Sequence, residues 1–326
     1  MTTEIINNTA CDIGLLDSEI RSVNNLIDQN LVSLLPACNK LIRYFRAHSG
    51  KMIRPKLLLL SAGACGKINE EHILSAAIFQ IIHDATLLHD DVIDEGQLRR
   101  NTETINSRWG NKIAVLTGDF LIGHALKMCL YLSSKAMEVV VEAVIKTCEG
   151  EISQDFNEQY ENISENEYIR LIQMKSAEMF SQCCYLGALL SGANDADCQH
   201  LRNYGLFVGT AYQISDDIQD ICSNDDQIGK SSGRDIKSKV ITLPVIHYIQ
   251  NGGDRRLLKK MSRRETFEEL IKSGSIEYCQ RKIESYCNAA IEHLKPLVDS
   301  EYKYLLKNTA ELIASRSYIT QFKYIK

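Results

Sequence analysis

Residues 73–93, ILSAAIFQIIHDATLLHDDVI, predict a helix that is apolar on most of its sides. Isoleucine and leucine recur among alanines without a continuous polar stripe, and a helix of this kind belongs at the centre of a bundle. Five carboxylates nevertheless fall within residues 84–95, and two arginines, Arg99 and Arg100, follow them. Because like charges on neighbouring turns destabilise a helix, something else must offset their repulsion. A bound cation is the obvious candidate.

The rest of the chain repeats the helical pattern. Apolar residues recur at three- and four-residue steps in residues 13–31, 137–153, 167–192 and 201–221, and no segment shows the strict alternation of a strand. Only four prolines interrupt the chain, and its polar or glycine-bearing breaks are too short to be linkers between domains. We therefore predict an all-α fold in which residues 1–326 form a single bundled helical domain.

The composition excludes several classes of protein. With 44% hydrophobic and 24% charged residues the chain is typical of a globular protein, and a net charge of -5 gives no basic surface for nucleic acid. No apolar run reaches the roughly 18 residues of a membrane span, and the N-terminus shows no secretion signal, so we expect a cytoplasmic protein. The 11 cysteines are scattered without a C-x-x-C pair. They are expected to be reduced and mostly buried, not disulfides or zinc ligands.

Two copies of one carboxylate pattern, D-D-x-x-D late in an apolar helix, carry the functional signal: Asp90, Asp91 and Asp94, and then Asp216, Asp217 and Asp220. Residues four apart share one helix face. One copy is typical of a helix end that meets water, but two matched copies followed by cationic residues are not. Buried carboxylates require cations, and aspartates without neighbouring sulfur ligands suit Mg²⁺. We predict two facing triads around a few Mg²⁺ ions and a polyphosphate.

Cationic side chains accompany both triads: Lys51, Arg54, Arg99, Arg100, Lys175 and Lys230. Arginine binds phosphate oxygens in a bidentate manner, and lysine supplies a compact charge. Each alone is typical of a solvated side chain. Together with the two triads they indicate diphosphate binding.

With these residues the chain resembles the trans-isoprenyl diphosphate synthases, from about residue 35 to residue 318. The matching segments are GKMIRP (50–55), LLHDDVIDEGQLRR (87–100), RWGNKIAVLTGDFLIGHAL (108–126), YQISDDIQD (212–220) and GKSSGRDIKSKVITLP (229–244). The third of these segments is similar to the corresponding segment of the long-chain members of the family. The resemblance implies the isoprenoid synthase fold, with about ten or more helices around a deep central cavity, usually as a homodimer. It implies head-to-tail condensation of isopentenyl diphosphate with an allylic diphosphate.

The resemblance also implies roles for individual residues. Asp90 and Asp94 would hold two Mg²⁺ ions with Asp91 in support, and Asp216 a third, supported by Asp217 and Asp220. The allylic diphosphate would lie on Arg99, Lys175, Ser176, Gln213 and Lys230. Isopentenyl diphosphate would lie on Lys51, Arg54, His83 and Arg100. The catalytic set would be Asp90, Asp91, Asp94, Lys175, Asp216 and Asp217.

Some positions depart from the family pattern. Asp84 stands where many relatives carry threonine, and Asn101 where glycine is common. Lys239 falls one residue early, so no role is assigned to it. His89, next to Asp90, is expected to pack or to form a hydrogen bond, because Mg²⁺ prefers oxygen.

The product and the partners follow from the same resemblance. Ala85 and Thr86, one to two turns before Asp90, are small, whereas aromatic residues there stop elongation at short products in the family. We expect a C30–C40 product, the side chain of a respiratory quinone, with at most peripheral membrane contact for its release. One alternative is the large subunit of a two-protein synthase that needs a small partner. Another is a class I terpene cyclase, which would need no isopentenyl diphosphate site.

Overall fold

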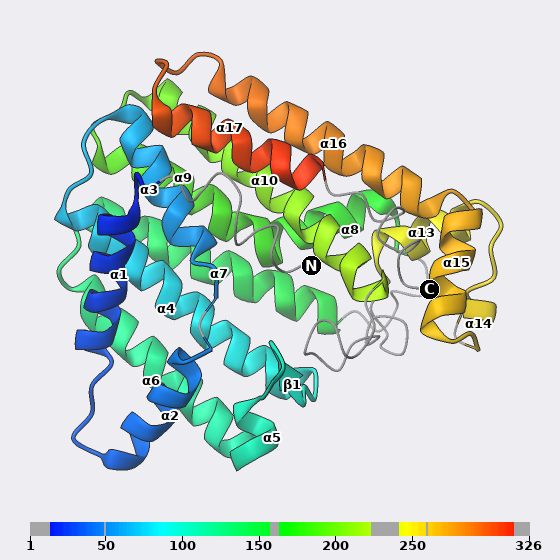
Figure 1. Ribbon diagram of the computed structural model, residues 1–326, viewed down its shortest axis with the longest axis horizontal. Helices are drawn as coiled ribbons and strands as arrows, with labels where there is room; N and C mark the ends of the chain where they lie inside the picture. The colour runs from blue at the N-terminus through cyan, green and yellow to red at the C-terminus, as the bar shows by residue number, and fades with distance from the viewer. Residues whose placement is uncertain (1–13, 49, 157–162, 223–240, 259, 316–326) are drawn as a thin grey trace.

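The computed structural model describes residues 14–48, 50–156, 163–222, 241–258 and 260–315, and these are folded almost entirely into helices (Figure 1). In chain order the helices are α1 (Asp17–Asn30), α2 (Pro36–Arg46), α3 (Ile53–Cys65), α4 (Glu70–Ile93), α5 (Ile105–Trp109), α6 (Asn111–Cys129), α7 (Ser134–Phe156), α8 (Glu165–Ile172), α9 (Glu178–Leu190), α10 (Asp195–Cys222), α13 (Leu243–Gln250), α14 (Arg255–Leu258), α15 (Arg263–Lys272), α16 (Ser275–Leu294) and α17 (Glu301–Ala314). A π-helical turn, η2 (Gln173–Ala177), joins α8 to α9. The predicted all-α fold is confirmed.

A small hairpin follows α4, although the sequence predicted no strand. Strands β1 (Leu98–Arg99) and β2 (Thr102–Glu103) pair in antiparallel fashion. Arg100 and Asn101 form the turn with φ angles of 53° and 61°, as the central positions of a type I′ turn require. The prediction was wrong here because a strand of two residues is too short to show alternation.

Helix α4 forms the centre of the bundle. Asn69 caps its first turn by accepting hydrogen bonds from the backbone N–H groups of Glu71 and His72. Every residue from Ser75 to Ile82 is buried, so more than two turns are enclosed on all sides. This burial explains the absence of a polar stripe in the sequence, and the predicted central position is confirmed.

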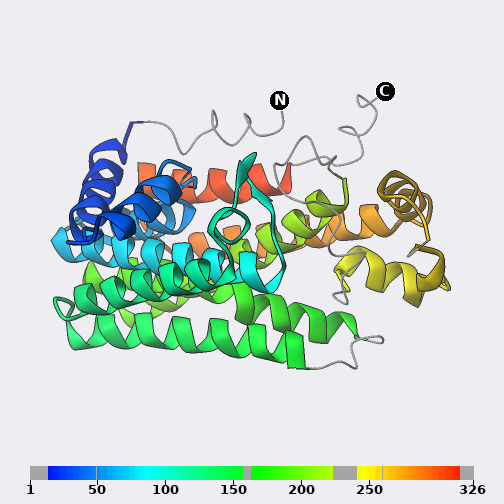
Figure 2. The same ribbon diagram turned by 90° about the horizontal axis from the view of Figure 1, so that it is seen from below.

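The long helices run roughly along one direction, and the packing brings the two aspartate-bearing helices together. Helix α4 packs against α3 and α6, while α10 packs against α9 and α16. Figures 1 and 2 show the carboxyl ends of α4 and α10 directed toward the same end of the bundle, with the β1–β2 hairpin beside the end of α4. Each helix carries its aspartate triad at that end, so the fold gathers both triads into one region.

The state of the cysteines and the apolar character of the helices agree with what the composition predicted. All ten cysteines within the described ranges are free, and most of them are buried. Among the helices that the structure describes, none combines the length and the apolar character needed to cross a membrane.

Candidate active site

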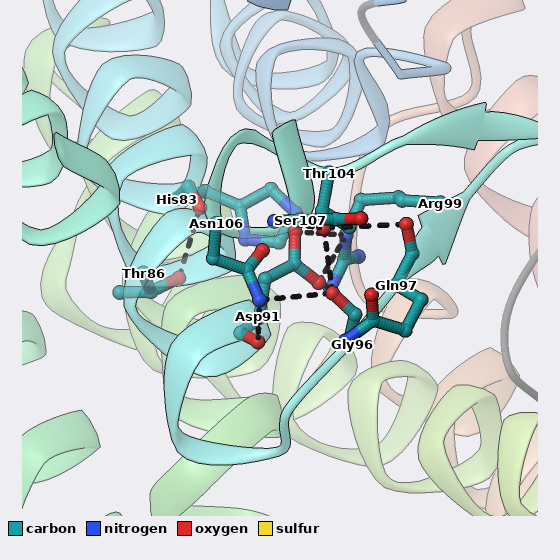
Figure 3. Close-up of polar contacts among 9 residues, drawn as sticks. All are labelled: His83, Thr86, Asp91, Gly96, Gln97, Arg99, Thr104, Asn106 and Ser107. Atoms are coloured by element: carbon teal, nitrogen blue, oxygen red, sulfur yellow. Dashed lines mark hydrogen bonds and ion pairs between the residues drawn. The ribbon is translucent and has the colours of Figure 1, made fainter. Parts of the chain in front are cut away.

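The first aspartate triad lies at the carboxyl end of α4, and polar side chains from the following loop fix that end. Asn106 Nδ2 donates hydrogen bonds of 2.9 Å to the carbonyl oxygens of Asp91 and Gly96. The hydroxyl of Thr104 donates to the Gly96 carbonyl at 2.5 Å (Figure 3). The last turn of a helix leaves carbonyl groups without helical partners. The bond to Asp91 satisfies one of them, and the bonds to Gly96 tie the loop that follows the helix to its end, beside the C-cap residue Asp94.

Asp91 and Arg99 form a bidentate ion pair. Arg99 Nε donates to both carboxylate oxygens of Asp91 at 3.0 and 3.1 Å, and Nη2 donates to Oδ1 at 2.8 Å (Figure 3). The exposed fractions of the two side chains are 6% and 19%, so the pair is well shielded from water. A paired fork of this kind fixes the guanidinium plane. Asp91 therefore positions Arg99. The predicted contact between Asp91 and a metal ion stays a prediction.

Asp90 and Lys175 face one another across the site together with Glu151, which the sequence analysis missed. The pKa of Asp90 is raised to about 7, mainly by burial and also by the charges of Glu151 and Asp94, against the opposing effect of Lys175 and Arg99. Lys175 Nζ lies 2.8 Å from Glu151 Oε2. Burial lowers the pKa of Lys175, but Glu151, Asp90 and Asp94 outweigh it, and the net shift is upward. Three carboxylates thus surround one ammonium group.

The backbone around Lys175 departs from the α-helix. Lys175 and Ser176 lie within the π-turn η2, and π-turns inside helices occur frequently at functional sites. Helix α7 packs closely on this turn at Gly150, where a Cβ atom would lie only 2.6 Å from the backbone nitrogen of Lys175. A glycine at 150 is therefore needed for α7 to approach. Neither the π-turn nor this contact has a signal in the sequence that could have predicted it.

The second triad lies near the end of α10, where other side chains hold two of its carboxylates. Asp217 is buried and accepts hydrogen bonds from Tyr168 Oη at 2.5 Å and from Gln213 Nε2 at 2.8 Å. Burial raises the pKa of Asp217. Arg263 Nη2 lies 3.6 Å from Asp220 Oδ1, while Asp220 Oδ2 is buried without a hydrogen-bond partner. Gln213, predicted as a diphosphate ligand, thus positions Asp217 in this structure.

A second group of cations interacts electrostatically with both aspartate-bearing helices. Burial lowers the pKa of Arg54, while negative charge on Asp84 of α4 and on Asp216 of α10 raises it, so this guanidinium interacts with both helices. It also lies over the ring of Phe180 at 4.9 Å. Arg100 Nη1 donates to the carbonyl of His48 at 2.6 Å.

His83 belongs to the same group. Burial lowers the pKa of His83 well below its usual value, and Arg54, Arg99 and Arg100 lower it further. The imidazole is therefore neutral at physiological pH and can donate one hydrogen bond without adding charge. Three of the four predicted isopentenyl diphosphate ligands are thus brought together, and Lys51 precedes Arg54 by three residues on the same segment.

Backbone strain is concentrated in the segments that carry these cations. Of the described non-glycine residues, those with positive φ are Met52, Glu95, Arg100 and Asn101. All four lie in residues 51–54 or 94–101. Such conformations persist only where the surrounding structure imposes them, and they cluster at functional sites.

The remaining predicted positions are placed as follows. Ala85 is fully buried on α4, while Thr86 is half-buried and its hydroxyl donates to the carbonyl of His83 at 2.9 Å (Figure 3). His89 Nε2 lies 3.3 Å from the carbonyl oxygen of Val115, in agreement with the expected hydrogen bond. Lys230 and Lys239 lie outside the described residues.

The carboxylates fit a hard divalent cation. Within the residues that the structure describes, no three His, Cys, Asp or Glu side chains form a ready-made metal cage. Mg²⁺ is commonly held by one or two carboxylates together with water and phosphate oxygens, so it requires no such cage. Two features show what a cation would stabilise: Asp220 Oδ2, buried without a partner, and Asp90, whose pKa burial and neighbouring carboxylates raise.

Comparison with known proteins assigns the family. Residues 35–278 match the family model described as polyprenyl synthetase. The chain belongs to this family. It is 33% identical over 313 residues to octaprenyl diphosphate synthase of Escherichia coli (strain K12), covering 93% of this chain and 97% of that protein. It is 32% identical to heptaprenyl diphosphate synthase component 2 of Bacillus subtilis (strain 168), covering 94% of this chain and 90% of that protein.

A solved structure confirms the fold. The crystal structure of polyprenyl synthase from Caulobacter crescentus CB15, complexed with calcium and isoprenyl diphosphate, matches it with a TM-score of 0.87 at 30% identity. The match covers 93% of this chain and 96% of that chain. The isoprenoid synthase fold expected from the resemblance is therefore confirmed.

The contact between α7 and the π-turn can be tested with Gly150→Ala. The added methyl group must push α7 away from Lys175, and we expect a loss of about 1–3 kcal/mol in the free energy of unfolding, the range for overpacking. Urea unfolding followed by circular dichroism measures it. Gly123→Ala on α6 is the matched control, because a Cβ there meets no atom within 4 Å. An equal effect of the two substitutions would contradict the tight contact.

Proposed function

We propose that this protein is a trans-prenyltransferase that condenses isopentenyl diphosphate with an allylic diphosphate, in the presence of Mg²⁺, to a long all-trans polyprenyl diphosphate. The observation that carries the proposal is the position of Arg54, which interacts electrostatically with both aspartate-bearing helices and lies beside His83 and Arg100. One cationic pocket thus adjoins two carboxylate triads. The whole chain would act as one domain, since the family match runs from α2 into α16.

The allylic diphosphate would lie between the triads. Asp90, Asp94 and Asp216 would hold the Mg²⁺ ions, two to three in number, with Asp220 in support. The ions, when bound, neutralise diphosphate charge. Arg99 and Lys175 face the same position, and we propose that Ser176, Gln213 and Lys230 complete this site. The polyprenyl synthase of Caulobacter crescentus was crystallised as a complex with calcium, which supports a divalent cation in this fold.

The first chemical step would be heterolysis of the allylic C–O bond. The bond electrons leave with the pyrophosphate, and an allylic carbocation remains. Arg99 and Lys175 stabilise the charge that develops on the leaving group, which is the largest electrostatic demand of the reaction. Asp91 contributes by holding the Arg99 guanidinium in a fixed plane, so no reorganisation is needed during the step.

The second substrate would be held by Arg54, Arg100, Lys51 and the neutral His83. Its double bond attacks the carbocation and forms the new C–C bond. The resulting tertiary cation loses a proton from the neighbouring carbon to the departing pyrophosphate, which restores a double bond. No protein nucleophile is required. A second diphosphate pocket favours this synthase reaction over a terpene cyclase, which ionises a single substrate.

The proposed quaternary structure is a homodimer. Several large apolar side chains on α6 and α7 are exposed: Leu116, Ile122, Leu126, Val141, Ile145 and Ile152. Large apolar side chains gathered on an exposed face of a globular protein are typical of an interaction site. The name of the Bacillus subtilis relative, component 2, keeps the two-protein synthase as the second candidate. In that case the same apolar surface would serve a small partner.

The central experiment uses the purified chain with farnesyl diphosphate, labelled isopentenyl diphosphate and Mg²⁺. We expect a ladder of prenyl products ending in one dominant length, and a loss of activity on addition of a chelator. Asp90→Asn should lower kcat by roughly 100-fold or more, because a neutral amide holds Mg²⁺ less well than a carboxylate and the leaving group then loses part of its stabilisation. Asp299→Asn, at a fully exposed site on the loop before α17, is the control. Absence of incorporation by a folded chain would contradict a self-sufficient synthase, and cyclic products would support the cyclase.

Product length tests the assignment of Ala85 and Thr86. We propose that the growing chain passes these positions and reaches C30–C40. Thr86→Phe and Ala85→Phe should both shorten the dominant product, because an aromatic ring would block the path. Thr86 is the more informative site, since its side chain is only half-buried and a larger one is tolerated there more easily. Sizing of the dephosphorylated products by thin-layer chromatography gives the answer. An unchanged length in both active variants would rule out these positions as determinants.

The dimer is tested with Leu126→Glu combined with Ile145→Glu. Two buried carboxylates in an apolar interface oppose association, so we expect the mass measured by light scattering to fall from that of two chains to that of one. Val298→Glu, at an exposed position between α16 and α17, is the matched control and should stay dimeric. A dimer that survives the double substitution would place the interface elsewhere. A wild-type chain that is monomeric would favour the two-protein alternative.

A further inference from the structure

Asp84 has an unusual position for a carboxylate. It lies next to His83 on α4, and only 3% of its surface is exposed. Its Oδ1 accepts a hydrogen bond from Gln80 Nε2 at 2.8 Å, while its Oδ2 is buried without a hydrogen-bond partner. Neither the fold nor the proposed reaction requires a charge here. A buried carboxylate oxygen without a partner is unfavourable, so other charges must offset its cost.

The offsetting charges are arginines of the isopentenyl diphosphate pocket and its border. The pKa of Asp84 is raised to about 6, mainly by burial, while the hydrogen bond from Gln80 and the charges of Arg46, Arg100 and Arg54 act in the opposite direction. At pH 8 the side chain is therefore ionised. The hydrogen bonds of Arg46 go to Asp28 and Asn24, and that of Arg100 goes to the backbone of residue 48. Asp84 thus acts on these guanidinium groups through space.

The charge of Asp84 acts mainly on one of the two diphosphate sites. Its charge contributes to the environment of Arg54 and of Arg100. The charges that act on Lys175, at the allylic site, are those of Glu151, Asp90 and Asp94. A change at Asp84 should consequently alter the binding of one diphosphate and leave the other nearly unaffected.

We propose that Asp84 is a specificity-determining residue: a fixed counter-charge that weakens diphosphate binding in the isopentenyl diphosphate pocket formed by Arg54, His83 and Arg100. The inference rests on the proposed function for the identity of the substrate. A negative charge among arginines lowers the positive potential that attracts an anion. The pocket thereby binds its substrate reversibly, and inorganic pyrophosphate, which presents the same phosphate oxygens, serves as a probe of its affinity for a diphosphate.

The test compares three variants at pH 8. Asp84→Asn removes the charge and keeps the shape, and its amide can still pair with Gln80. The double variant Gln80→Glu/Asp84→Asn restores one carboxylate one helical turn away and keeps a hydrogen-bonded pair. Asp299→Asn, whose side chain is fully exposed, gives the same change in net charge far from the pocket. Urea unfolding establishes that each variant is folded.

Two readouts are measured. The first is the Kd of inorganic pyrophosphate by calorimetry without divalent cation, and the second is the KM for each substrate against kcat. We expect Asp84→Asn to tighten pyrophosphate binding roughly tenfold, a fraction of the interaction between two unit charges in direct contact near a protein surface. Its KM for isopentenyl diphosphate should fall, with the KM for the allylic substrate unchanged. The double variant should return toward wild type, and Asp299→Asn should match wild type.

Other outcomes overturn the inference. The inference is wrong if Asp84→Asn binds pyrophosphate equally well or more weakly than wild type. It is also wrong if the double variant behaves like Asp84→Asn, or if pyrophosphate binds to no variant. A fall in both KM values would also overturn it, because it would show an effect not confined to one pocket. If the wild-type chain does not incorporate isopentenyl diphosphate, the proposed function fails, and the pyrophosphate titration still decides whether Asp84 acts as a counter-charge.

Discussion

The ion pair between Asp91 and Arg99 is the contact on which the arrangement of the site depends. It joins the last turn of α4 to the β1–β2 hairpin, so the chain folds back over the end of the helix. Asn106 and Thr104 extend the same connection by bonding to the carbonyls of Asp91 and Gly96. Without these contacts, the repulsion between the carboxylates at the end of α4 would favour conformations in which they point into solvent. With it, they stay beside the cations that a diphosphate requires.

The sequence predicted the helical fold and the principal charged residues, because both have local signals. Hydrophobic periodicity identifies helices, and D-D-x-x-D is visible within five residues. The partners that position these groups lie far away in the chain and have no such signal. Tyr168 donates to Asp217 across 49 residues, and Glu151 pairs with Lys175 across 24 residues of sequence and a π-turn. Neither partner differs, as a residue type, from many others on helix surfaces. The hairpin was missed for the related reason that its strands contain two residues each.

The cations of the site are balanced in three physically different ways. Asp91 holds Arg99 in a bidentate pair, which fixes its orientation. Glu151 contacts Lys175 at 2.8 Å and Gln154 Oε1 lies 3.5 Å from the same nitrogen, so this compact cation is held by separate acceptors and not by a rigid fork. Asp84 lowers the potential around Arg54 and Arg100 without touching them. Fixed orientation suits the group that meets the leaving diphosphate. A lowered potential suits a pocket that must bind and release a diphosphate in every cycle of elongation.

This division has a consequence for stability. Buried carboxylates with raised pKa values oppose folding. The positive φ angles at Arg100 and Asn101 also oppose it, by at most about 3 kcal/mol for each residue. The enclosed turns of α4 supply the apolar burial that offsets them, which is why the helix that ends in the site is also the helix at the centre of the bundle. A cation and a diphosphate at the triads would relieve the same repulsion, and ligands that bind only the folded state stabilise it by mass action. The residues that make the free site unfavourable are therefore the ones that couple substrate binding to the stability of the fold.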